Sequence, residues 1–89
     1  MIDKNKPSEW IKVTMKSRTA ASDTRYYQFD PEKNLYKVRF KLCKGGVKRR
    51  SSVRGFTIDD VNSWFTLDII IVTPLTAEDF NIEKLAAVF

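Results

Sequence analysis

The chain has 89 residues with a formal net charge of +5, and 43% of its residues are hydrophobic. This length fits one small domain and the apolar content suffices for a packed core, so we expect residues 1–89 to form a single unit rather than two domains or a disordered chain. There is no histidine, which removes the commonest general base and the imidazole ligands of zinc and haem, and we expect no enzyme, no cofactor and no metal site.

Two strands are expected in the first third of the chain. Residues Glu9–Lys16 alternate between polar and apolar side chains, a period that indicates a strand. Thr24–Phe29 is rich in aromatic residues and ends at a turn-forming sequence that contains Pro31, which predicts a second strand. Its neighbouring residues Tyr26 and Tyr27 point to opposite faces of the sheet, so we expect one of the two rings to be exposed.

A basic β-hairpin forms the centre of the expected sheet. Residues 33–54 contain nine basic and no acidic residues, and from Tyr36 to Leu42 the charges alternate strictly with apolar side chains. Gly45-Gly46 divide this run from 47–54, and such glycine pairs are typical of two-residue hairpin turns because both central residues need positive φ. We therefore expect strands at about 35–44 and 47–54.

The register of this hairpin separates two faces. With Gly45-Gly46 as the loop, Lys44 pairs with Val47, and the side chains of each strand alternate between the core and solvent. The face on the core carries Tyr36, Val38, Phe40, Leu42, Val47 and Val53. The other face is almost purely cationic and carries Lys37, Arg39, Lys41, Lys48, Arg50, Ser52 and Arg54.

This cationic face has two interpretations. Like charges that oppose each other across strands, as in Lys41–Arg50, destabilise a sheet, so some other role must favour them. The functional interpretation is an anion-binding surface, in which Arg39 and Arg50 are central enough to contact bases. The alternative is a merely solvated face that resists aggregation.

A short helix follows the hairpin. Thr57 has the chemistry of a helix N-cap, and Asp60 is at the third helical position, where its side chain can complete a capping box with Thr57. Phe56 can pack on Val61. These signals predict a helix at about 58–65 whose apolar side chains cover the core face of the hairpin.

A further strand and helix complete the chain. Leu67–Thr73 lacks alternation and precedes Pro74, which predicts a strand that ends at the proline and is buried on both faces or at an interface. The following Thr76 and Asp79 repeat the capping pattern, so a second helix is expected at about 77–88. Residues 85–89 are apolar and should pack onto the sheet or enter a partner.

The expected fold is α+β, with an antiparallel sheet of three to five strands around a central basic β-hairpin and one or two short helices packed against it. The longest apolar run, Ile69–Val72, is far below the roughly 20 residues that span a bilayer, so no membrane partner is expected. Cys43 is the one cysteine, so no intramolecular disulfide forms and we expect a cytoplasmic protein.

Part of the sequence resembles a known DNA-binding family. The segments Tyr36–Phe40, Gly46–Ser51 and Gly55–Thr57, leading into Trp64-Phe65, are similar to the amino-terminal arm-site DNA-binding domain of phage and transposon integrases, whose architecture the plant AP2/ERF domain shares. The resemblance covers about residues 25–65. It implies three antiparallel strands backed by one helix, with the exposed sheet face in a DNA groove.

Carried over by position, the resemblance places Lys37, Arg39, Lys41, Lys48, Arg50, Ser52 and Arg54 against nucleic acid. The chain departs from the family in two ways. It has no recombinase domain, and it has an added N-terminal strand as well as the added strand and helix of 67–88.

The function expected from the sequence is that of a small non-enzymatic nucleic-acid-binding protein of phage or mobile-element type. Its partner would be duplex or single-stranded DNA, and an exposed Tyr26 or Tyr27 would favour an unpaired base. The alternative is a protein–protein interaction module, such as a phage-encoded inhibitor, that docks on an acidic host protein surface. A homodimer formed through Leu67–Val72 or the C-terminal helix is compatible with either function.

Overall fold

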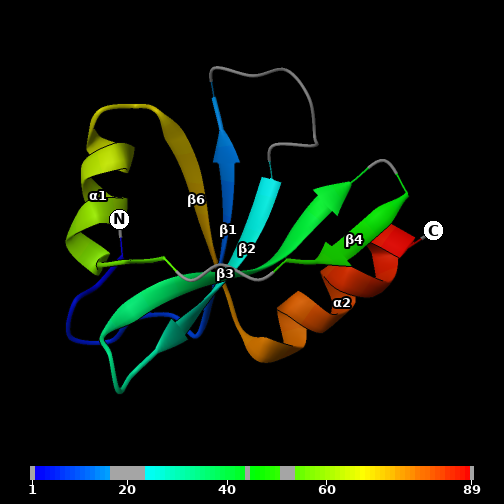
Figure 1. The fold of residues 1–89 in the computed structure, drawn as a ribbon, viewed down its shortest axis with the longest axis horizontal. Helices are drawn as coiled ribbons and strands as arrows, with labels where there is room; N and C mark the ends of the chain where they lie inside the picture. The colour runs from blue at the N-terminus through cyan, green and yellow to red at the C-terminus, as the bar shows by residue number, and fades with distance from the viewer. Residues whose placement is uncertain (1, 17–23, 44, 51–53, 89) are drawn as a thin grey trace.

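A computed structural model describes residues 2–16, 24–43, 45–50 and 54–88, the last three without their side chains. Six strands form one antiparallel sheet in the order β4-β3-β2-β1-β6, with β5 paired to the same edge of β3 as β4 (Figure 1). The α+β class is confirmed, and the sheet has more strands than the three to five expected. Along the chain the elements are β1 (Trp10–Met15), β2 (Thr24–Asp30), β3 (Leu35–Cys43), β4 (Gly46–Arg49), β5 (Gly55–Phe56), α1 (Ile58–Thr66), β6 (Ile70–Leu75) and α2 (Ala77–Val88).

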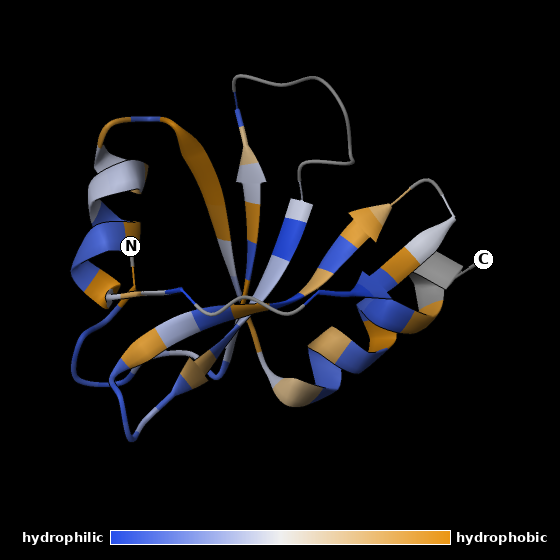
Figure 2. Ribbon diagram, in the orientation of Figure 1, coloured by the Kyte–Doolittle hydropathy of each residue, from blue (hydrophilic) through white to orange (hydrophobic). Residues whose placement is uncertain are grey.

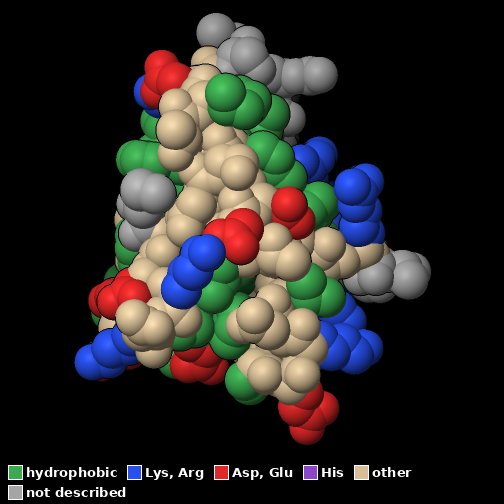
Figure 3. Space-filling model, turned by 90° about the vertical axis from the view of Figure 1, so that its left-hand side faces the viewer, with side chains coloured by type: hydrophobic (Ala, Val, Ile, Leu, Met, Phe, Trp, Pro, Cys, Tyr) green, Lys and Arg blue, Asp and Glu red, His purple; other side chains and the backbone are tan. Residues whose placement is uncertain are grey.

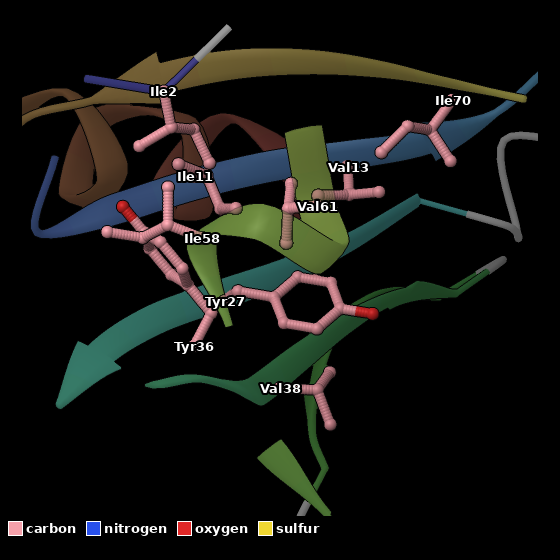
Figure 4. Packing of buried hydrophobic residues seen from close by; sticks show 9 residues of the cluster. All are labelled: Ile2, Ile11, Val13, Tyr27, Tyr36, Val38, Ile58, Val61 and Ile70. Atoms are coloured by element: carbon pink, nitrogen blue, oxygen red, sulfur yellow. The ribbon is translucent and has the colours of Figure 1, made fainter. Parts of the chain in front are cut away.

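The two helices cover opposite faces of the sheet. On one face of β1, Ile11 and Val13 belong to a buried cluster with Ile58 and Val61 of α1 (Figure 4). Trp10 points to the opposite face of β1 and belongs to a second buried cluster. Trp10 packs with Phe80 of α2, and their rings stack 4.0 Å apart. Because neighbouring residues of a strand point to opposite faces, the sheet is the middle of three layers.

Both helices begin with the capping chemistry expected from the sequence. The Asp60 amide donates to Thr57 Oγ1 over 3.1 Å, while the Thr57 amide donates to the Asp60 carboxylate. The same reciprocal pair joins Thr76 and Asp79 ahead of α2. These capping boxes satisfy amide groups that have no partner inside the helix, and they confirm the starts of both helices.

The N-terminal segment is fastened to the α1 side of the sheet. The buried amide of Ile2 donates to Asn62 Oδ1 over 2.8 Å, and Asn62 Nδ2 donates back to the Ile2 carbonyl. The hydroxyl of Tyr36 on β3 donates to the carbonyl of Ser8 over 2.7 Å. These contacts cover one end of the core with residues that precede β1.

The hairpin register differs by one residue from the predicted one. Cys43 pairs with Gly46 and Leu42 with Val47, so Gly46 belongs to the second strand instead of the loop. Gly46 has a φ of 118°, which side-chain-bearing residues rarely adopt, and this conformation explains why a glycine follows the loop.

A β-bulge in β3 changes which face each side chain occupies. Tyr27 pairs with Val38 whereas Tyr26 pairs with Phe40, so Arg39 is the extra residue. Before the bulge, Tyr36 and Val38 join the α1 cluster, but Phe40 and Leu42 after it pack in the α2 cluster. The expectation that one face carries all four apolar side chains is therefore wrong, because an added residue reverses the alternation.

The last strand also differs from its prediction. β6 begins at Ile70 and continues through Pro74 to Leu75, at the open edge of the sheet. Pro74 is tolerated because an edge strand needs hydrogen bonds on one side only. Although the first half of β6 is apolar (Figure 2), Ile71 is 47% exposed, so the strand is not buried on both faces.

Apolar side chains at the ends of both helices also remain exposed. Phe65 of α1, which was expected to cover the hairpin, is exposed, whereas Ile58 and Val61 are buried. Leu85 of α2 is 64% exposed and does not pack onto the sheet. Val53 and Phe89, which the predictions also involved, lie outside the described residues.

Candidate nucleic-acid interface

The bulge divides the predicted cationic face between the two sides of the sheet. Lys37 pairs with Gln28, which pairs with Trp10, and these three lie on the α2 side. Beyond the bulge, Lys41 lies between Arg25 and Lys48 in a row across three strands on the other side of the sheet. We call Arg25, Lys41 and Lys48 the cation row.

Three arginines meet in one cleft on the α2 side. Its volume is about 540 Å³, within the range of sites that hold small ligands. We call this cleft, between the sheet and the first turns of α2, the arginine cleft. It is lined by Trp10, Gln28, Arg39, Phe40, Arg49, Arg50, Ala77, Phe80 and Asn81.

Backbone structure brings the three arginines together. Arg39 is the bulge residue, and its carbonyl accepts a hydrogen bond of 2.8 Å from the Arg50 amide. Arg49 pairs with Phe40, a neighbour of Arg39 in the chain. The structure thus unites Arg39 and Arg50 as the sequence predicted, but separates them from Lys41 and Lys48.

Arg49 is a member of the site that the sequence prediction missed. In the predicted register Arg49 pairs with Leu42, and the prediction assigned Arg49 neither to the core face nor to the cationic face. The shift of one residue places it opposite Phe40 and over the cleft. The sequence signal for Arg49 is the uninterrupted run Lys48-Arg49-Arg50. Two of these three cations share a site in the predicted register and in the observed one.

The charge of the arginine cleft is uncompensated. No acidic residue lines it, and in the part of the chain that the structure describes none of its three guanidinium groups has an ion pair or a hydrogen bond. All three arginines are exposed to solvent, so their guanidinium groups are accessible to an anion and can form charge-assisted hydrogen bonds with it.

Several of the described acidic side chains are engaged elsewhere. Ion pairs join Lys4 with Asp59 at 2.5 Å, Lys12 with Glu83 at 3.1 Å, and Lys16 with Asp68. Asp60 and Asp79 cap the helices. Figure 3 accordingly shows acidic and basic side chains interspersed on the side of the molecule where α1 lies.

The two tyrosines expected at the interface, and the rings of the arginine cleft, are poorly placed for stacking on bases. Tyr26 and Tyr27 are 2% and 6% exposed, so the expectation that one of them is exposed is wrong. Each contributes to the core beneath a different helix. On the arginine cleft itself, the Trp10 ring stacks on Phe80, and Lys84 Nζ lies 4.5 Å from the centroid of the Phe40 ring.

The remaining predicted residues have separate positions. The Arg54 guanidinium lies over the Phe56 ring, 5.2 Å from its centroid, and Ser52 lies outside the described residues. Within the described ranges, acidic residues and Cys43 form no group of three that could hold a metal ion. In the same ranges, no helix is long and apolar enough to cross a membrane.

Comparisons with known proteins identify no relative. No family model, no curated protein and no solved structure matches the chain.

Proposed function

We propose that this protein is a small non-enzymatic nucleic-acid-binding protein, of phage or mobile-element type, that holds phosphate groups in the arginine cleft. The observation that carries the proposal is the convergence of Arg39, Arg49 and Arg50, without a carboxylate partner among the described residues, on one cleft. Guanidinium groups match phosphate oxygens in pairs of parallel hydrogen bonds, and the apolar floor of the cleft strengthens such contacts.

The structure favours recognition of the phosphate backbone over stacking on unpaired bases. A protein that binds single strands usually offers aromatic faces to successive bases. Here Tyr26 and Tyr27 are buried, and the Trp10 ring is stacked on Phe80. We therefore expect duplex DNA to bind at least as tightly as a single strand, with Arg39 or Arg50 as the residue that reaches a base.

The test compares two double variants that remove the same charge from opposite sides of the sheet. The first is Arg39→Ala/Arg50→Ala in the arginine cleft, and its matched control is Lys41→Ala/Lys48→Ala in the cation row. Fluorescence anisotropy of a labelled duplex at low salt should show binding weakened by roughly a hundredfold in the first variant, since two charge-assisted contacts are lost. The control should lose much less.

The dependence on salt provides a second readout of the same variants. Each phosphate contact contributes about 0.9 to the slope of the logarithm of the binding constant against the logarithm of salt concentration, so the slope should fall by about 2 in the arginine variant. Equal losses of affinity and slope in both variants would assign the binding to net charge alone and contradict the proposal.

A protein partner is the second candidate function. The uncompensated arginines would also complement an acidic protein surface, and α2 exposes Ile82 and Leu85 on its outer side, where an interface needs apolar contacts. Absence of duplex and single-strand binding at low salt would reject the nucleic-acid proposal and leave this one. Either function suits a cytoplasmic protein, given the unpaired thiol of Cys43.

A further inference from the structure

A second pocket lies on the opposite side of the sheet from the arginine cleft. It lies between α1 and the sheet, and its volume of about 270 Å³ exceeds the roughly 150 Å³ of an apolar protein cavity that binds benzene. Val13 and Tyr27 at its base belong to the α1 cluster, whereas the arginine cleft rests on the α2 cluster. We call it the Arg25 pocket.

The walls of the Arg25 pocket are apolar and partly flat. Aliphatic side chains of Val13, Met15 and Ile70 form one part, and the rings of Tyr27, Phe56 and Trp64 form another. The Phe56 and Trp64 rings meet edge to face at 4.8 Å. A slot between rings and aliphatic side chains fits the flat body of an aromatic molecule and excludes water from it.

Arg25 is the one charged residue among those that line the pocket. Its side chain is half-buried, and no carboxylate in the described ranges pairs with it. Lys41 and Lys48 continue the cation row from Arg25 across the same side of the sheet, which adds positive potential on that side. A half-buried cation beside apolar walls gains most from a ligand that brings one negative charge.

Tyr27 supplies a hydroxyl beside this cation. Burial raises the pKa of Tyr27 from its usual 10.0, although the neighbouring Arg25 opposes the rise. The phenol therefore keeps its proton at neutral pH and can donate a hydrogen bond. In Figure 4 the hydroxyls of Tyr27 and Tyr36 point in opposite directions, so the Ser8 carbonyl that Tyr36 engages does not compete for this donor.

We propose that the Arg25 pocket binds a small aromatic monocarboxylate, with its ring system between the apolar walls and its carboxylate on the Arg25 guanidinium. This inference is independent of nucleic-acid binding, because it concerns the other side of the sheet.

The experiment titrates the isotope-labelled protein with 2-naphthoate and, in parallel, with its neutral analogue 2-naphthamide, and follows amide and indole signals by NMR. Naphthoate should shift the signals of Val13, Arg25 and Trp64, and naphthamide should bind roughly tenfold more weakly because it lacks the charge.

Three variants locate the interaction. Arg25→Gln should reduce the affinity for naphthoate to that of naphthamide, and Met15→Trp should weaken both by filling the pocket. The matched control Arg39→Gln removes the same side chain from the arginine cleft and should change neither. The proposal is overturned if both compounds bind equally, if the shifts cluster at the arginine cleft, or if the pocket signals do not move at millimolar concentrations.

Discussion

The three tyrosines are residues at which burial changes proton affinity. Burial raises the pKa of Tyr36 to about 12, and the hydrogen bond from its hydroxyl to the Ser8 carbonyl uses the proton that ionisation would remove. Burial also raises the pKa of Tyr26, with an added contribution from the carboxylate of Glu83, and the pKa of Tyr27. All three phenols therefore stay neutral well into the alkaline range.

This proton affinity predicts a loss of stability at high pH. A phenol with a higher pKa in the folded state binds its proton more tightly there than in the unfolded chain, so its contribution is complete below pH 10.0 and is lost as the pH rises towards about 12. Absorbance at 295 nm should show tyrosine ionisation at a higher pH in the native protein than in concentrated urea. Coincident titrations would contradict the burial of these side chains.

At the scale of the elements, the two adjacent glycines of the hairpin, Gly45 in the loop and Gly46 at the start of β4, have different requirements. A Cβ at Gly45 would meet no atom within 4 Å, whereas Gly46 has a φ of 118°. Gly46→Ala should lower the free energy of unfolding by about 1–3 kcal/mol, since a side chain strains that conformation. Urea denaturation measures the change, and Gly45→Ala is the matched control. A larger loss at Gly45 would support the predicted register over the observed one.

Local signals explain why the helices were predictable. Each capping box lies within four consecutive residues, so Thr57 with Asp60 and Thr76 with Asp79 reveal the helix starts without any knowledge of the tertiary fold. The strands β1 and β2 likewise follow from residue type and alternation. Their predicted bounds differ from the observed ones by about one residue.

The hairpin register needed information that is not local. Two adjacent glycines allow two turn positions, and alternation along β3 gives no sign that Arg39 is an extra residue. The bulge becomes favourable because it turns Phe40 and Leu42 toward Phe80 of α2, which lies on the face expected to be open to solvent. The same helix buries Tyr26. Tertiary packing thus decided which cations share a surface.

For the molecule as a whole, the distribution of charge follows the three layers. The described acidic side chains include those that cap the two helices and those that pair with Lys4, Lys12 and Lys16. Cations of the hairpin lie at two sites on opposite sides of the sheet, the arginine cleft and the cation row. The chain therefore presents two separate cationic surfaces, of which the arginine cleft concentrates more charge in one cavity.

The most direct test of the account is an NMR titration of the protein with a short DNA duplex that follows the side-chain Nε–H signals of its arginines. We predict that the signals of Arg39, Arg49 and Arg50 shift or broaden at low salt and recover as salt is added, while the signal of Arg25 on the opposite side of the sheet stays in place. Movement of Arg25 without the other three, or no movement of any arginine at low salt, would contradict the assignment of nucleic-acid binding to the arginine cleft.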